Sequence, residues 1–394
     1  MPPQANVPVR QLAAALLGSC SRSGINLITH RLFSVSSSPP GQSAAIIKQL
    51  RERSGAPISD VKNMLVEHGW DAEKAYEALR KKGLAAAAKK ASRHAAEGLV
   101  GASFAASAAS SASTAATTSG ASSAGGPGSV VIVELNSETD FVARNSMFQD
   151  LLREVMAAAH SLGAGAAVGP DHSLDLEQVL AARTPSGALV SEAVTQVAAQ
   201  VRENVRLRRA FRVDSGDGLV FPYVHLAAAP GLGKLASAVV LRSSDSTSLA
   251  GAQGSAASSS AVQAAGEGLA MHVAGMRPAY LTRGSVPADV VAKERELLTQ
   301  QLQQDAAFRG KPPQVVSKVV EGRLGKLMGE WCLAEQRYVL DDEVTVEQMM
   351  ARLRKEVGRP LQISGFLRVQ CGEGLGPKGG DDFATEVARI VSES

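Results

Sequence analysis

The sequence predicts an α+β fold, in which helices are mixed with antiparallel strands. Segments with apolar residues at helical spacing occur in both halves of the 394-residue chain. Short segments rich in β-branched residues lie between them and are bounded by Gly, Ser or Asn. With 45% hydrophobic and 20% charged residues the chain can bury a core, and its length suggests two or three domains.

The N-terminal segment has the composition of an organellar transit peptide. The first acidic residue is Glu52, whereas Arg10, Arg22 and Arg31 precede it among Ala, Leu and Ser. We therefore expect a transit peptide over residues 1–43. A Ser-rich stretch after Arg31 favours the mitochondrion (matrix), with the chloroplast as the alternative destination. A disordered tail is the alternative structure.

Residues 44–83 predict a small module of three short helices. The first helix is expected over residues 44–53, before a turn that contains Gly and Pro. Capping and helix-breaking residues bound the other two: Ser59 and Gly69 the second, Asp71 and Gly83 the third. Because the module is this short, we expect a thin core.

The next segment predicts a connector followed by a linker, together residues 84–129. Residues 84–98 are rich in Ala, Lys and Arg and indicate a basic helical connector. Residues 101–129 carry no charge and consist almost entirely of Ala, Ser, Thr and Gly. Such a tract buries too little apolar surface to offset the conformational entropy lost on ordering. We expect a flexible linker or a loop insertion here, and a similar uncharged tract covers residues 246–266.

The rest of the chain predicts the helices and strands of a core. Strands are predicted at residues 130–135, 207–213, 219–225, 235–242 and 366–369. Helices are predicted at residues 147–160, 174–182, 191–204, 289–304, 314–329 and 382–392. A turn at residues 310–313 joins two of these helices, so residues 289–329 predict an antiparallel helical hairpin.

Composition and motifs argue against several classes of function. A net charge of +3 and 4% aromatic residues give no overall attraction to nucleic acid. Cys20, Cys332 and Cys371 lie too far apart in sequence for a zinc motif or a disulfide framework. The chain has no long apolar run typical of a membrane span, and no phosphate-loop, hydrolase or metalloprotease motif. We expect no metal, no cofactor and no covalent catalysis.

Several sequence blocks follow one another in an order that characterises a known family. The blocks are LRERSGAPISDVKNMLVEHGWDAEKAYEALRKKG (50–83), AAAAKKASRHAAEGLV (85–100), VIVELNSETDFVARNSMFQDL (131–151), VRENVRLRRA (201–210), YVHLAAAPGLGKLASAVVL (223–241), LAMHVAGMRPAYL (269–281), GKPPQVVSKVVEGRL (310–324), GFLRVQCGEG (365–374) and DDFATEVA (381–388). In this order they resemble translation elongation factor Ts in its organellar form. The resemblance covers residues 44–394 apart from the two uncharged tracts, and Cys371 departs from the family's acidic pattern.

This resemblance implies a fold, a partner and an activity. The implied fold is a ubiquitin-associated-like three-helix module, two related sheet-and-helix core subdomains at residues 130–222 and 223–394, a protruding helical hairpin and a C-terminal helix. The implied activity is guanine-nucleotide exchange on elongation factor Tu in organellar translation elongation. The factor binds the GDP-bound partner, dislodges Mg²⁺ and promotes GDP release so that GTP can bind. The resemblance implies no direct nucleotide binding, no membrane and no nucleic-acid partner.

The exchange motif is expected at Thr139, Asp140, Phe141 and Val142, directly after the strand at residues 130–135. The resemblance implies that Phe141 inserts between helices of the partner and that Asp140 perturbs the Mg²⁺ site. Thr139 would fix the turn through its hydroxyl, and Val142 would support the ring. Exchange makes no covalent bond, so a rigid apolar side chain beside a carboxylate is suited to it. For the tetrapeptide alone, the alternative is that Phe141 is core and Asp140 a helix cap.

Other residues suggest further or competing roles. By resemblance Tyr223 and His225 are possible partner contacts, with a structural role as the alternative. A basic cluster suggests either an RNA patch or, as the better interpretation, a solvated or internally paired face: Arg202, Arg206, Arg208 and Arg209. We expect His272 in the core. The competing functions are RNA binding and a ubiquitin-binding adaptor built on residues 44–83.

Overall fold

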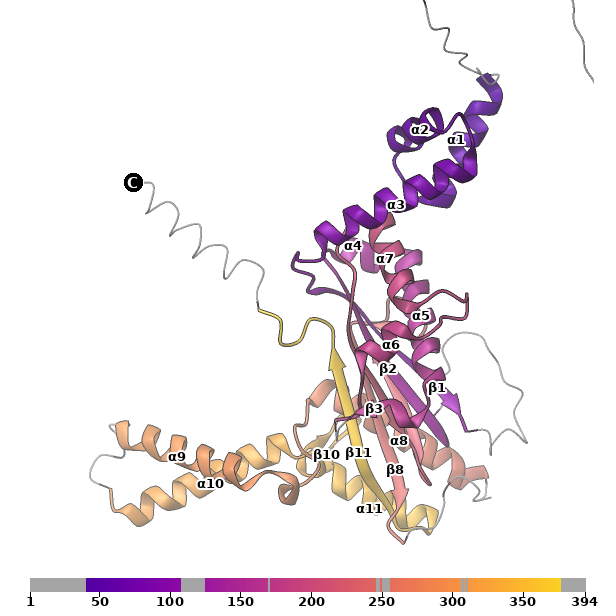
Figure 1. Cartoon of the computed structure of the whole chain (residues 1–394). Coiled ribbons are helices and arrows are strands. Elements are labelled where there is room, and N and C mark those ends of the chain that lie inside the picture. The colour runs from indigo at the N-terminus through magenta and orange to yellow at the C-terminus, as the bar shows by residue number, and fades with distance from the viewer. Residues whose placement is uncertain are drawn as a thin grey trace, which may run out of the picture.

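The computed structural model describes residues 40–107, 125–168, 171–245, 249, 256–305, 308 and 311–376. Within them, helices are mixed with antiparallel sheets, which confirms the predicted α+β class (Figure 1). The predicted C-terminal helix at residues 382–392 and residues 1–39 of the predicted transit peptide lie outside the described residues.

The N-terminal module consists of three helices around a small core of its own. The helices are α1 (Pro40–Ser54), α2 (Ile58–Glu67) and α3 (Ala72–Lys90). Asp71 caps α3 as predicted, because its carboxylate accepts hydrogen bonds from two amides of the first turn. The predicted cap Ser59 is wrong, since Pro57 already holds the extended backbone that precedes α2.

The third helix is longer than predicted. It continues through Gly83 to Lys90, so the predicted end at Gly83 is wrong and residues 84–90 belong to α3. A Cβ atom at Gly83 would lie 3.0 Å from the Cβ of Ala199. Ala199 belongs to α7 (Val190–Val201), against which α3 packs. Glycine therefore serves the close approach of two helices here rather than a helix end.

A strand replaces part of the predicted connector and linker. β1 (Glu97–Ala106) pairs in antiparallel register with the whole of β2 (Gly128–Ser137). The prediction of a helical connector is therefore confirmed at residues 84–90 but wrong at 91–98. The prediction of a flexible linker or loop insertion is wrong at residues 101–106 and 128–129, which belong to strands. The small residues of β1 serve packing, because a Cβ atom at Gly101 would lie 2.6 Å from the sulfur of Met156. The Ala/Ser tract thus connects two paired strands instead of separating the module from the core.

Two antiparallel sheets form the centre of the molecule. Their strand orders are β3-β4-β5-β2-β1-β7 and β11-β8-β6. The remaining strands are β3 (Ala167–Val168), β4 (Ser173–Leu174), β5 (Arg206–Asp214), β6 (Leu219–His225), β7 (Leu232–Gly233), β8 (Leu235–Ser243) and β11 (Leu361–Gln370). All five predicted strands are confirmed, although β11 begins earlier than predicted.

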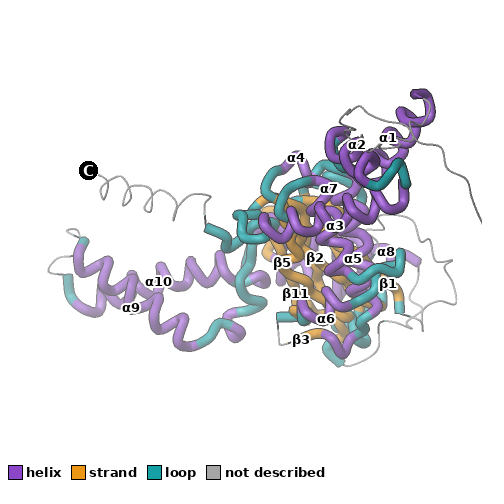
Figure 2. The backbone as a smooth tube through the Cα atoms, turned by 45° about the horizontal axis from the view of Figure 1, so that its top comes forward, coloured by secondary structure: helices purple, strands orange, loops and turns teal. Residues whose placement is uncertain are grey.

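The sheets pack face to face, and helices cover their outer faces (Figure 2). Val130 and Ile132 of β2 contribute to the core between the sheets. Val131 and Val133 point to the other face, which is covered by α5 (Ser146–Ser161), α6 (Leu176–Ala181) and α7. Because β2 is buried on both faces, its apolar run is nearly continuous rather than alternating.

The smaller sheet is covered by a helix that the sequence did not predict over its full length. α8 (Ala256–Met276) includes residues 256–266, so the prediction that the uncharged tract at residues 246–266 is an insertion without regular structure is wrong there. A Cβ atom at Gly266 would lie 2.4 Å from the ring of Phe221, which shows why this helix needs small residues. α11 (Val346–Val357) packs beside α8, and the short hairpin β9 (Arg337–Tyr338) and β10 (Asp341–Thr345) precedes it.

The helices α9 (Ala288–Gln304) and α10 (Pro313–Trp331) protrude from the core as a pair (Figure 1). They confirm the helices predicted at residues 289–304 and 314–329. The pair has its own apolar contacts, which include Leu302 of α9 and Leu324 of α10. The division of the core into subdomains at residue 222 stays a prediction. β7, which follows that boundary, pairs with β1 in the larger sheet.

Candidate functional site

The tetrapeptide 139–142 lies on a short turn between the central strand and the first covering helix. β2 ends at Ser137, Thr139 occupies an N-cap position with extended backbone, and α4 (Asp140–Ala143) follows. Asn145 then caps α5 by accepting a hydrogen bond from the amide of Met147. The second cap requires extended backbone at Asn145, which explains why α4 is only one turn long.

Phe141 is the most exposed large apolar side chain of the part of the chain that the structure describes. It is 78% exposed, whereas the adjacent Val142 is 8% exposed and belongs to the core beneath α5. The alternative that Phe141 is an ordinary core residue is therefore wrong. A rigid aromatic ring held in water beside a buried anchor is a feature typical of a binding surface.

Asp140 lies at the start of α4 and is also accessible. Its Oδ2 atom lies 2.9 Å from a guanidinium nitrogen of Arg144, and both side chains are partly exposed. An exposed pair of this kind contributes little stability, so the carboxylate can exchange Arg144 for another partner. The alternative role of helix cap is wrong, because Thr139 holds the cap position.

Thr139 is fixed by a residue that the sequence reasoning did not single out. Its amide donates to Oε2 of Glu203 at 2.9 Å, and its hydroxyl donates to Oε1 of the same carboxylate at 2.6 Å. The hydroxyl of Ser137 donates to the Thr139 carbonyl at 2.8 Å. The hydroxyl of Thr139 therefore fixes the turn, although its partner comes from the loop between α7 and β5. The helix predicted over residues 191–204 placed Glu203 within a helix, but α7 ends at Val201, so that prediction is wrong at residues 202–204.

Tyr223 and His225 lie together at the end of β6 in the smaller sheet. The Tyr223 hydroxyl is 3.0 Å from Nδ1 of His225, and the two rings are stacked with centroids 6.0 Å apart. Leu226 follows with 67% exposure and a φ of +51°. No hydrogen bond between described residues joins this pair to the turn at residues 139–142, so the structure shows two separate accessible features.

Three arginines of the basic cluster are internally paired and Arg206 is exposed, so the cluster combines the paired and the solvated face that the better interpretation allows. Arg208 and Arg209 both donate to Glu134, whose carboxylate is fully buried, at 2.8 and 2.7 Å. A buried carboxylate of this kind needs such partners to offset its lost hydration. Arg202 lies 3.7 Å from Asp60 of the N-terminal module. These three side chains are therefore occupied by intramolecular partners.

The other polar residues of interest are structural. His272 is fully buried, its Nδ1 accepts from the amide of Val339, and its Nε2 donates to Gln336. Burial lowers the pKa of His272, in agreement with a neutral ring and with the predicted core role. Burial, with the Glu134 carboxylate second, raises the pKa of the Cys371 thiol to about 12.

Neither a metal centre nor a membrane-spanning helix is found in the described ranges. No three His, Cys, Asp or Glu side chains there are grouped so that they could hold a metal ion. No described helix combines the length and apolar character needed to cross a bilayer. The glycine-rich segment at residues 230–234 leads into β7 and β8 rather than into a helix N-terminus, the arrangement that a phosphate loop requires.

Comparisons with known proteins place the turn within a matched region. Residues 138–373 match the family described as Elongation factor TS. The chain is 61% identical over 388 residues to Elongation factor Ts, mitochondrial, of Chlamydomonas reinhardtii, covering 98% of this chain and 97% of that protein. It is 40% identical over 346 residues to Elongation factor Ts of Paramagnetospirillum magneticum, covering 88% and 96%. Identity to Elongation factor Ts, mitochondrial, of Arabidopsis thaliana is 37% over 356 residues, covering 88% and 81%.

Proposed function

Because the chain belongs to the elongation factor Ts family, we propose that it is the guanine-nucleotide exchange factor for an organellar elongation factor Tu. The single observation that carries the proposal is the exposed ring of Phe141 on a turn whose neighbours are fixed. Members of this family act on elongation factor Tu, and this turn is the part of the chain suited to act as a wedge.

The mechanism that we propose is a mechanical and electrostatic displacement. GDP is held in such a partner through its phosphates and Mg²⁺. The ring of Phe141 enters the partner and separates elements that support the Mg²⁺ site, while the Asp140 carboxylate disturbs the charge balance there. Linkage requires that a factor that weakens GDP binding is itself bound more weakly when GDP is present. Release of GDP, entry of GTP and dissociation of the factor follow from that one coupling.

The rigidity of the turn supports this mechanism. Val142 is buried in the core on one side of Phe141, and Thr139 is held by Glu203 on the other. A ring that is fixed before binding loses less conformational freedom when it inserts. Tyr223, His225 and the exposed Leu226 are proposed as a second contact with the partner.

The proposed location is the mitochondrial matrix. Two of the relatives that cover most of this chain carry the word mitochondrial in their names, and the Arg-rich N-terminal composition agrees with import. An exchange assay with elongation factor Tu from mitochondria and from chloroplasts tests this choice, because the cognate partner should respond at a lower factor concentration.

The test of function measures release of labelled GDP from elongation factor Tu. The wild-type chain should accelerate release, and replacing Asp140 and Phe141 together by Ala should reduce the rate at least about tenfold. The far-ultraviolet circular dichroism should not change. A matched control replaces Leu340 and Asp342, an exposed apolar residue and an exposed acidic residue of the β9–β10 hairpin, and should exchange normally. Failure of the wild-type chain to release GDP would refute the proposed function.

A further inference from the structure

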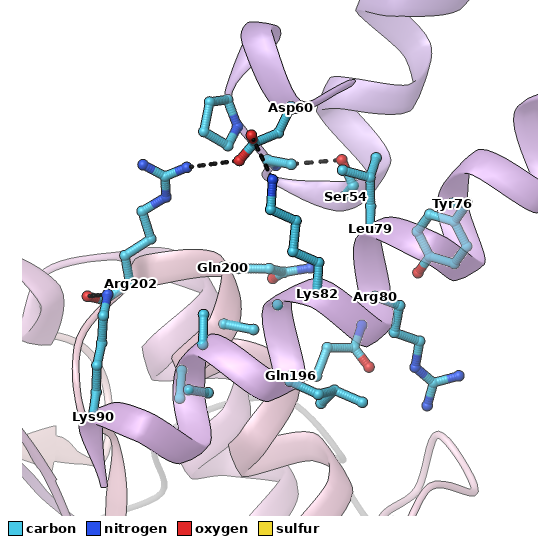
Figure 3. Close-up of a pocket in the computed structure, with 18 residues that line it drawn as sticks. Ser54, Asp60, Tyr76, Leu79, Arg80, Lys82, Lys90, Gln196, Gln200 and Arg202 are labelled. Atoms are coloured by element: carbon cyan, nitrogen blue, oxygen red, sulfur yellow. Dashed lines mark hydrogen bonds and ion pairs between the residues drawn. The ribbon is translucent and has the colours of Figure 1, made fainter. Parts of the chain in front are cut away.

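The loop that ends α7 connects three segments that are distant in sequence. Lys90 at the end of α3 donates to the backbone carbonyl of Arg202 at 2.6 Å (Figure 3). The side-chain amide of Asn204 donates to the carbonyls of Ala91 and Arg93, at 3.1 and 2.7 Å. This side of the loop is therefore bound to the chain that leaves the N-terminal module.

The other side of the same loop is bound to the exchange turn by reciprocal hydrogen bonds. Glu203 accepts both the amide and the hydroxyl of Thr139 through its two carboxylate oxygens. In return, Oε1 of Glu138 accepts the amide of Asn204 at 2.7 Å. Hydrogen bonds to a carboxylate are stronger than those between neutral groups. Two crossed connections of this kind fix both the distance and the relative orientation of the two segments.

The backbone of the loop indicates that these contacts determine its shape. Arg202 has a φ of +62° and lies in the left-handed region, which a residue with a Cβ atom adopts at a cost. Such a conformation persists where the surroundings hold it. Asp60 of the module lies between Lys82 and Arg202, so a charged contact from α2 also reaches this residue (Figure 3).

We propose that Glu203 is a positioning residue for nucleotide exchange, which holds Thr139 so that Phe141 and Asp140 are presented to the partner in one orientation. The inference rests on the proposed function. Glu203 does not need to touch the partner for this role. Its two bonds end at the N-cap of α4, and Phe141 lies two residues further on, just before the buried Val142. Without Glu203, Thr139 keeps the bond from Ser137 to its carbonyl but loses both bonds of its own amide and hydroxyl. The bond between Asn204 and Glu138 and the buried Val142 then hold only its neighbours on either side.

The kinetic test compares Glu203→Ala, Glu203→Gln and Thr139→Val with the wild-type chain. Each variant is titrated against GDP-loaded elongation factor Tu to obtain the maximal release rate and the half-saturating concentration. Glu203→Ala should lower the maximal rate about tenfold and change the half-saturating concentration less than about threefold. Glu203→Gln keeps the side-chain size and one acceptor oxygen, so its loss should be smaller. The double variant Glu203→Ala/Thr139→Val should match Glu203→Ala, because both changes remove the same contact.

A structural control separates positioning from simple destabilisation. Glu335 is also half-buried and accepts two hydrogen bonds, from Arg283 at the base of the helical pair. Glu335→Ala should leave the maximal rate unchanged. A loss of folded protein lowers the active concentration, so it would raise the half-saturating concentration and spare the maximal rate. That result for Glu203→Ala, or additive losses in the double variant, would overturn the proposal.

Hydrogen exchange tests the hold on the turn without using the partner. In Glu203→Ala the amides of residues 138–145 should exchange faster, while those of β2 keep their protection. Unchanged exchange at these amides would overturn the inference even if GDP release were slow. A wild-type chain without exchange activity would refute the proposed function and this inference with it. Full activity of a folded Glu203→Ala variant would refute the inference alone.

Discussion

Replacing Phe141 by Ala separates stability from function, and the two effects can be estimated from exposure. Complete burial of a Phe side chain stabilises by about 1.5–3 kcal/mol. Phe141 is 78% exposed in the free protein, so folding recovers only about a fifth of that, or about 0.3–0.7 kcal/mol. We therefore expect Phe141→Ala to lower the free energy of unfolding by less than about 1 kcal/mol.

The exposed surface of the ring is buried only when the ring inserts into the partner, so its burial energy contributes to exchange rather than to folding. About four-fifths of the burial energy, or about 1.2–2.3 kcal/mol, corresponds to a loss of about 7- to 50-fold in exchange efficiency. The assay is release of labelled GDP over a range of factor concentrations, combined with urea unfolding of the same samples. Phe148→Ala is the matched comparison, because Phe148 is fully buried on α5. It should lose about 3–5 kcal/mol of stability, and Phe148→Leu serves if it does not fold.

Two results would refute this reasoning. If Phe141→Ala loses more than about 2 kcal/mol of stability, the ring contributes to the core of the folded protein and is not free to insert into the partner. If the folded variant exchanges GDP within about twofold of wild type, insertion of the ring contributes less than its surface predicts.

Three further predictions follow from buried groups. Glu134→Ala should lower the free energy of unfolding by about 3–5 kcal/mol in urea titrations, because it leaves two arginines without their buried carboxylate; unchanged stability would contradict this. Burial lowers the pKa of His160 and His272, so the unfolded chain takes up protons first as the pH falls below about 6.5. The free energy of unfolding should therefore be highest above that pH and fall below it. Between pH 7.5 and 5.5, His272→Gln should lose less of this free energy than wild type. An equal loss in the two proteins would contradict the prediction. Burial raises the pKa of the Cys371 thiol from 9.0 to about 12. In a Cys20→Ser chain, Cys371 should therefore react with iodoacetamide at pH 8 at least about 100-fold more slowly in the folded protein than in urea. Equal rates would contradict this prediction.

Much of the fold could be predicted from the sequence because its signals are local. Apolar and β-branched runs predicted β2, β5, β6, β8 and β11, and Asp71 marked the start of α3 correctly. The errors concern segments of small residues. Gly101 in β1 and Gly266 in α8 are surrounded by large side chains from other elements, so their burial depends on neighbours such as Met156 and Phe221. An Ala/Ser/Gly segment has no hydrophobic periodicity of its own, and without its neighbours it resembles a linker.

The residues of the candidate site could be predicted, but the residue that holds them in place could not. The resemblance to elongation factor Ts singled out residues 139–142, and the structure shows Phe141 exposed and Val142 buried on one turn. Glu203 was not singled out, because it lies 64 positions from Thr139. A hydrogen-bond partner at that separation depends on the path of the chain between α7 and β5.

The sequence by itself determined which segments form β2 and α5, and where the strand gives way to the turn that carries Phe141. Those features follow from the spacing of apolar residues and from caps such as Asn145, which act within a few residues of the chain. Only the tertiary structure decided that Glu203 holds Thr139 and that Glu134 joins two arginines. The sequence does not show which donor a given carboxylate will bind. That depends on which segments the packed sheets and helices bring within hydrogen-bond distance.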